Sequence, residues 1–204
     1  MAHAPVQLDP AEPRRLPGLS GKWSGPATGV GIAALVIALV IGWIGGETVM
    51  QQVMFGYLVN FIFFLSIPVG ALLFVMVHML CKTGAVVTYR RIGEFIAATF
   101  PMLAVLAVPV VIAGDAIVAA KDPYLNLPFW TVRIALYFAV YILLAKFFLG
   151  KSLQQDATGA PRLTLNMQAA AGPGIIVYAF VTTFLATDLI KSLDAHWFST
   201  IYGV

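Results

Sequence analysis

Residues 53–81 read VMFGYLVNFIFFLSIPVGALLFVMVHMLC, an apolar run that contains no Asp, Glu, Lys or Arg. About 20 apolar residues in a helix are enough to cross the roughly 30 Å hydrocarbon layer of a membrane. This run exceeds that length, so a helix built from it must tilt or protrude from the bilayer. The stretch therefore predicts a transmembrane helix.

The composition of the whole chain agrees with this interpretation. The chain has 204 residues, of which 60% are hydrophobic and only 10% are charged. Soluble proteins carry about 25% charged residues, so this chain cannot cover a water-facing surface. The formal net charge of +3 is spread over several loops, which argues against nucleic-acid binding. The sequence predicts an integral membrane protein in contact with lipid.

Other apolar runs lie on both sides of this segment. They lack the two-residue alternation of a membrane β-strand, so each of them predicts a helix. The predicted fold class is all-α, a polytopic transmembrane helical bundle over residues 28–204 with five spans plus the start of a sixth. Besides 53–81, the predicted spans are 28–44, 92–119, 127–149 and 167–189, and the unfinished sixth is 196–204.

Residues 1–27 differ from the rest because they contain several prolines, two adjacent arginines and little apolar periodicity. We expect them to form a disordered tail. A cleaved signal peptide is the alternative interpretation of this tail with the first apolar run. That run ends in Gly45-Gly46-Glu47 without a small-x-small cleavage site, so an uncleaved anchor helix is favoured.

The distribution of basic residues predicts the orientation. Nine lie in segments that an alternating path places on one side of the membrane, and an excess of Lys and Arg marks the cytoplasmic side. The tail is therefore predicted to be cytoplasmic, and the segment 188–196 to lie outside. The nine are Arg14, Arg15, Lys22, Lys82, Arg90, Arg91, Lys146, Lys151 and Arg162, against Lys121, Arg133 and Lys191 on the other side.

Several kinds of cofactor site are excluded by residue counts. The single cysteine, Cys81, cannot form an internal disulfide, a Cys-x-x-Cys-His haem attachment or a cysteine-ligated iron–sulfur cluster. The three histidines, His3, His78 and His196, lie in the tail or near opposite surfaces, so they cannot ligate one haem. We expect no cofactor bound by this chain alone.

His78 and Glu94 lie about one turn inside neighbouring predicted spans, across a short loop. They could face each other near the cytoplasmic surface. One interpretation is a proton-entry pair, because histidine titrates near neutral pH. The other, which we favour, is an interfacial pair in contact with headgroups and water.

Asp115 and Arg133 lie inside apolar runs, on the outer halves of the third and fourth predicted spans. Antiparallel neighbours would place them at similar depth, where an unpaired charge is costly. A structural ion pair is the favoured interpretation, and a proton-exit or substrate-anion role is the alternative. Hydroxyl groups at membrane depth, such as those of Tyr137, Tyr141 and Thr182, mostly hold helices together.

From about Phe55 onward, four short segments resemble one family of proteins. The first is Tyr89-Arg90-Arg91-Ile92-Gly93-Glu94 with Pro101, the second is Tyr124-Leu125-Asn126 with Phe129 and Arg133, and the third is Lys151-Ser152 with Gln155-Asp156. The fourth and longest is residues 187–204, TDLIKSLDAHWFSTIYGV. These segments resemble the F subunit of bacterial alternative complex III, a quinol:cytochrome c oxidoreductase. Lys191 departs from the family pattern, which has a non-basic residue there.

The resemblance implies an NrfD-like (polysulfide-reductase-type) subunit of a complex in the bacterial inner membrane. Family members are about twice as long, so this chain resembles their N-terminal half. The implied partners are an NrfD-like quinone-binding subunit, a multihaem cytochrome c and an iron–sulfur subunit. Quinol or menaquinol oxidation is usually assigned to the sister subunit. The F subunit itself carries no redox centre and is assigned proton transfer and scaffolding.

Three functions stay open at this point. The favoured one is a non-catalytic or proton-conducting subunit of such a complex. The second is a small permease or transporter half that dimerises around a midplane site, and the third is a purely structural anchor. For the first, the proton-transfer candidates are His78, Glu94, Asp115, Arg133, Asp188 and His196.

Overall fold

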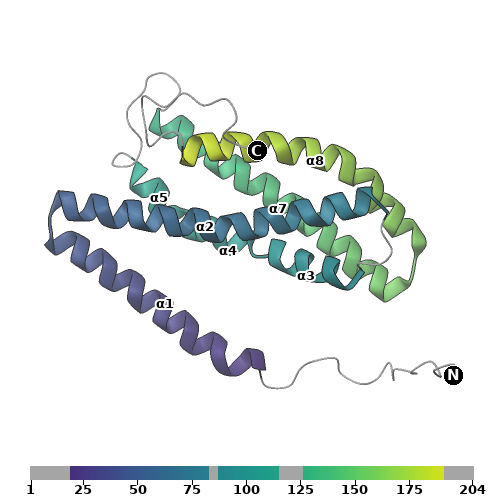
Figure 1. The fold of residues 1–204 in the computed structure, drawn as a ribbon, viewed down its shortest axis with the longest axis horizontal. Coiled ribbons are helices and arrows are strands. Elements are labelled where there is room, and N and C mark those ends of the chain that lie inside the picture. The colour runs from purple at the N-terminus through teal and green to yellow at the C-terminus, as the bar shows by residue number, and fades with distance from the viewer. Residues whose placement is uncertain (1–18, 83–86, 115–125, 191–204) are drawn as a thin grey trace. The chain divides into compact units, whose positions relative to one another are not determined.

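A computed structural model gives the fold and describes residues 19–82, 87–114 and 126–190. Every regular element among these residues is an α-helix, so the all-α prediction is confirmed. Five helical segments are long and apolar enough to cross a membrane, as expected for a multi-pass protein. In chain order the helices are α1 (Leu19–Ile44), α2 (Glu47–Leu80), α3 (Val87–Ala97), α4 (Phe100–Leu106), α5 (Val108–Ile112), α7 (Leu127–Thr158) and α8 (Pro161–Leu189) (Figure 1).

The chain divides into two compact units, residues 1–50 and 51–204. The first unit contains α1 and the first residues of α2, joined by a tight turn at Gly46. The φ angle of Gly46 is +83°, a conformation that only glycine adopts without strain. Since α1 begins at Leu19, residues 19–27 are helical, which corrects the expected tail. The remainder of that tail, residues 1–18, lies outside the described residues.

In the second unit, α7 and α8 form an antiparallel hairpin whose two helices lie side by side (Figure 1). Both helices extend well beyond the predicted spans 127–149 and 167–189. The turn between them uses Gly159 at φ +65°, whose N–H donates to the Gln155 carbonyl at 2.7 Å, and Pro161 in the first turn of α8. Glycine after a helix and proline at the start of one are the common stop and start signals.

The third predicted span is broken into α3, α4 and α5. Pro101 and Pro109 lie in the first turns of α4 and α5, because proline lacks an N–H and clashes with the preceding turn of a helix. The Tyr57 hydroxyl of α2 donates to the Leu106 carbonyl, the last of α4, at 2.6 Å. Breaks at membrane depth need such internal donors. Pro68 and Pro173, by contrast, lie inside continuous helices.

The core of the second unit follows one face of α7. Residues on this face recur every three or four positions, which is the period of a helix with one buried side. The face packs against α8, α4 and α3. Its buried members are Trp130, Arg133, Ile134, Tyr137, Phe138, Tyr141, Ala145, Phe148 and Ser152.

Gly93 sets the close approach of α3 to α2. A Cβ added at Gly93 would lie 3.0 Å from Val75 Cγ2 and 3.5 Å from the Ala71 carbonyl oxygen. We expect Gly93→Ala to destabilise the protein by about 1–3 kcal/mol, since the branched side chain of Val75, which is 1% exposed, would have to shift to make room. Gly70→Ala on α2 is the matched control, because no atom lies within 4 Å of its added Cβ. Thermal unfolding in detergent measures both, and equal midpoints would contradict this account.

Candidate functional site

Asp188 lies in the last turn of α8 and is completely buried. Arg133 of α7 binds both of its carboxylate oxygens, with Nε donating to Oδ2 at 2.8 Å and Nη2 donating to Oδ1 at 2.9 Å. The Tyr137 hydroxyl also donates to Oδ2, at 2.9 Å. A two-point arginine–carboxylate contact fixes geometry as well as charge. We call Arg133, Tyr137 and Asp188 the α7–α8 cluster.

The helix end explains why Asp188 needs these partners. The C-terminus of a helix carries partial negative charge, so a carboxylate there is unfavourable unless a cation balances it. The backbone carbonyl of Asp188 is among the last of α8, which lack partners within the helix. The Trp130 indole N–H donates to that carbonyl at 3.2 Å. The Arg133 guanidinium also lies 4.6 Å from the centre of the Phe129 ring, a cation–π distance.

Two of the predicted site residues, Arg133 and Asp188, are thus brought together. From the sequence, Asp115 was the expected ion-pair partner of Arg133. Asp115 and His196 lie outside the described residues, so the roles predicted for them stay predictions. Asp188, the first residue of the segment 188–196, is buried inside the bundle, and the side of the membrane predicted for that segment stays a prediction.

A second ionic cluster surrounds Glu94, whose side chain is 0% exposed. Its Oε1 lies 3.1 Å from Arg90 Nε, and its Oε2 accepts a hydrogen bond from Arg91 Nη1 at 3.2 Å. Arg91 also pairs with Asp156 of α7, and Arg90 donates to the Ser152 hydroxyl at 3.2 Å. These five residues form the α3–α7 cluster.

The α3–α7 cluster balances two arginines against two carboxylates. It holds the short helix α3 against α7 through contacts between residues that are far apart in the sequence. One edge of the cluster is exposed, since the Asp156 side chain is 60% exposed. Its centre is buried, since the Glu94 side chain is 0% exposed. The cluster therefore extends from the surface of the chain to the interior of the bundle.

His78 is half-buried near the end of α2, where its ring stacks on Phe74 with centroids 5.8 Å apart. Phe74 also lies beside Gly93 of α3, 3.5 Å from the position of an added Cβ. The ends of α2 and α3 are therefore close neighbours, as the short loop predicts. The proton-entry pair of His78 and Glu94 stays a prediction.

Hydroxyl groups connect α7 and α8 between the two clusters. Thr182 donates to the Tyr178 carbonyl at 2.8 Å, so the Tyr141 hydroxyl, 2.8 Å from Thr182 Oγ1, is the donor in that pair. The Tyr141 ring stacks on Phe100 of α4 at 4.8 Å. Towards the α3–α7 cluster, the buried face of α7 continues with the apolar Ala145 and Phe148.

Ser152, Asp156 and Trp130 were not predicted from the sequence to belong to a site. The signal for Asp156 and Ser152 is weak, because both lie in a polar stretch that resembles a loop in hydropathy. Arg90, Arg91 and Glu94 do carry a local signal, since residues three and four apart share one face of a helix.

No protein-family model matches the chain, and no curated protein matches it.

Proposed function

We propose that the chain is a membrane subunit of a quinol-oxidising complex of the alternative complex III type. It holds no redox centre of its own, supports the surroundings of a quinone or menaquinone site, and carries protons at membrane depth. Its partners are an NrfD-like quinone-binding subunit, a multihaem cytochrome c and an iron–sulfur subunit. Its place is the bacterial inner membrane, with the N-terminus in the cytoplasm.

One observation carries the proposal: the four segments that resemble the family meet in pairs. The first contributes Arg90, Arg91 and Glu94, which contact Ser152 and Asp156 of the third. The second contributes Arg133, which contacts Asp188 of the fourth. Residues from the four segments thus share two ionic clusters, each with a buried carboxylate, Glu94 or Asp188. That pairing is expected if the motifs are there to build one bundle.

The two clusters also suit a proton-conducting role. Ionisable groups at membrane depth are costly, and they often mark proton or ion pathways. Glu94 lies buried behind the exposed Asp156 at one end, and Asp188 lies buried at the other end of the α7–α8 hairpin. The Tyr141 and Thr182 hydroxyls lie between them. In this scheme Glu94 and His78 accept protons at the cytoplasmic end, and Asp188 is near the exit.

Purification of the native complex tests membership. A tagged chain should retain a multihaem cytochrome c, an iron–sulfur protein and an NrfD-like protein in stoichiometric amounts through two chromatographic steps. Mass spectrometry of the co-migrating bands and haem absorbance would identify them. A tagged chain that migrates alone or with a substrate-binding protein would contradict the proposal and favour a permease.

The proton role is tested by a double variant, His78→Ala with Glu94→Gln. Neither an alanine nor an amide can titrate, so proton translocation should fall while quinol oxidation continues. Proton uptake and cytochrome reduction would be measured in vesicles that hold the assembled complex. Glu94→Asp keeps the carboxylate and serves as the matched control. Normal translocation in the double variant would end this assignment.

The orientation is tested by two cysteines in a Cys81→Ser background. Gln154 and Asn126, both exposed, lie towards opposite ends of α7. The nine basic residues predicted on the cytoplasmic side place the start of α7 outside and its end in the cytoplasm. Asn126→Cys should therefore react with an impermeant thiol reagent added to intact cells. Gln154→Cys should react only after the membrane is opened. The reverse pattern would invert the topology.

A further inference from the structure

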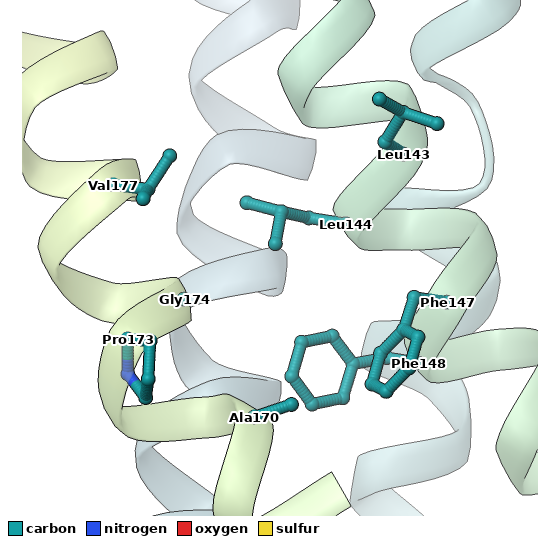
Figure 2. Close-up of a pocket in the computed structure, with 8 residues that line it drawn as sticks. All are labelled: Leu143, Leu144, Phe147, Phe148, Ala170, Pro173, Gly174 and Val177. Atoms are coloured by element: carbon teal, nitrogen blue, oxygen red, sulfur yellow. The ribbon is translucent and has the colours of Figure 1, made fainter.

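An apolar groove of about 510 Å³ lies between α7 and α8. Figure 2 shows Leu144 and Phe148 projecting from α7 towards α8, where Pro173 and Val177 form the opposite wall. All of the residues that line it are apolar. The groove has the size of a small-molecule site, but it offers no polar side chain to hold a polar ring.

The groove exists because α8 has small residues where α7 presents large ones. Ala170 and Gly174 line the groove on either side of Pro173, and residues this small leave space between α8 and Phe148. The groove is open on one side, since Phe148 is 1% exposed at its base while Leu143 is 67% exposed at its rim. In a membrane this open side faces the lipid.

Lys151 lies where the groove meets the end of the hairpin. It follows Phe147 and Phe148 by one turn of α7, so it lies on the same face of the helix as the groove. The structure describes no ion pair for Lys151, and Asp156, the nearest acid on α7, pairs with Arg91. At 1.5 Å per residue, α7 is about 48 Å long against roughly 30 Å of hydrocarbon. This polar end therefore reaches the lipid headgroups.

We propose that the α7–α8 groove binds one acyl chain of an anionic phospholipid whose phosphate contacts Lys151. The apolar walls match the chain, and the cation at the mouth matches the phosphate. Lysine is a common phosphate ligand, and basic residues at a membrane surface attract anionic lipid. The proposal requires only that the chain spans a membrane, and it does not depend on the complex to which the chain belongs.

Lys151→Gln tests the headgroup contact, and Lys146→Gln is its matched control. The two lysines are five residues apart on α7, so they point about 140° away from each other around the helix. The full chain would be purified in detergent and titrated with phosphatidylglycerol or phosphatidylcholine, with bound lipid counted by native mass spectrometry. We expect Lys151→Gln to weaken phosphatidylglycerol binding about fivefold and to leave phosphatidylcholine binding unchanged. Equal effects of the two substitutions would overturn the proposal.

Ala170→Trp tests the acyl-chain contact by filling the groove, with Ile176→Trp on the exposed face of α8 as control. We expect the groove-filling variant alone to lose the tightly held lipid. If that variant does not fold, photolabelling of the wild-type chain tests the same acyl-chain contact. Phosphatidylglycerol with a photoreactive acyl chain should label residues that line the groove, such as Leu143, Phe147 and Val177, and should not label Ile176. Uniform labelling of all exposed faces, or no labelling there because a partner's helix covers the groove, would reject the proposal.

Discussion

Replacing Asp188 by asparagine is expected to destabilise the bundle by about 3–5 kcal/mol, which is the usual effect of removing one partner from a buried ion pair. Arg133 would keep its charge among side chains that exclude water, since the carboxylate that binds it is 0% exposed. The Tyr137 hydroxyl would lose its charged acceptor as well. Unfolding of the full chain in detergent micelles, followed by heat or denaturant, measures the loss.

A second substitution and a control separate charge from packing. Arg133→Gln added to Asp188→Asn should restore much of the lost stability, because no buried charge is then unpaired. Asp156→Asn removes a carboxylate that is 60% exposed, and exposed pairs contribute about 1 kcal/mol or less. If Asp188→Asn assembles as well as Asp156→Asn but slows proton release, the pair is functional and not structural.

Replacing Trp130 by alanine is expected to destabilise the bundle by a similar amount, about 3–5 kcal/mol, because it empties a large buried volume. Trp130 is 0% exposed. Its ring packs against Gly114, just beyond the end of α5, where an added Cβ would lie 3.3 Å from it. The substitution also removes the N–H that binds the Asp188 carbonyl at 3.2 Å.

Two further tryptophan substitutions divide this effect into its parts. Trp130→Phe keeps most of the volume and loses only the donor, so it should cost about 1–3 kcal/mol, the penalty for one unsatisfied buried group. Trp43→Ala on α1 is the exposed control, since Trp43 is 83% exposed, and it should change stability little. Equal melting temperatures for Trp130→Ala and Trp43→Ala would contradict the assignment of Trp130 to the core.

The sequence was sufficient to predict the spans but not the ends of the helices. Hydropathy detects the part of a helix that lies in hydrocarbon, and the backbone ladder of α7 and α8 continues beyond it to Thr158 and from Pro161. Proline can break a helix wherever it occurs, yet Pro101 and Pro109 begin new helices within the third predicted span, whereas Pro68 and Pro173 lie inside continuous ones. Whether proline breaks a helix or stays within it depends on tertiary partners that the local sequence does not contain.

The two clusters differed in how far they could be predicted. Arg90, Arg91 and Glu94 share one helix face, so helical spacing alone indicates their contact. Arg133 and Asp188 lie on different helices, and their pairing depends on the register of the α7–α8 hairpin. The turn at Gly159 and Pro161 sets that register, because it places residues nearly equidistant from it at the same level. That turn lies between the two predicted spans, in a segment for which hydropathy predicts only a loop, so the register could not be predicted from the sequence.

The bidentate pair of Arg133 with Asp188 has a consequence for how the bundle responds to voltage. A bound pair carries no net charge, so the membrane potential exerts no net force on it during insertion or motion of the hairpin. Arg133 alone would gain or lose about 2.3 kcal/mol per 100 mV if it crossed the whole field. The carboxylate therefore cancels the contribution of Arg133 to any voltage dependence of α7, and in a chain without it Arg133 would add that contribution.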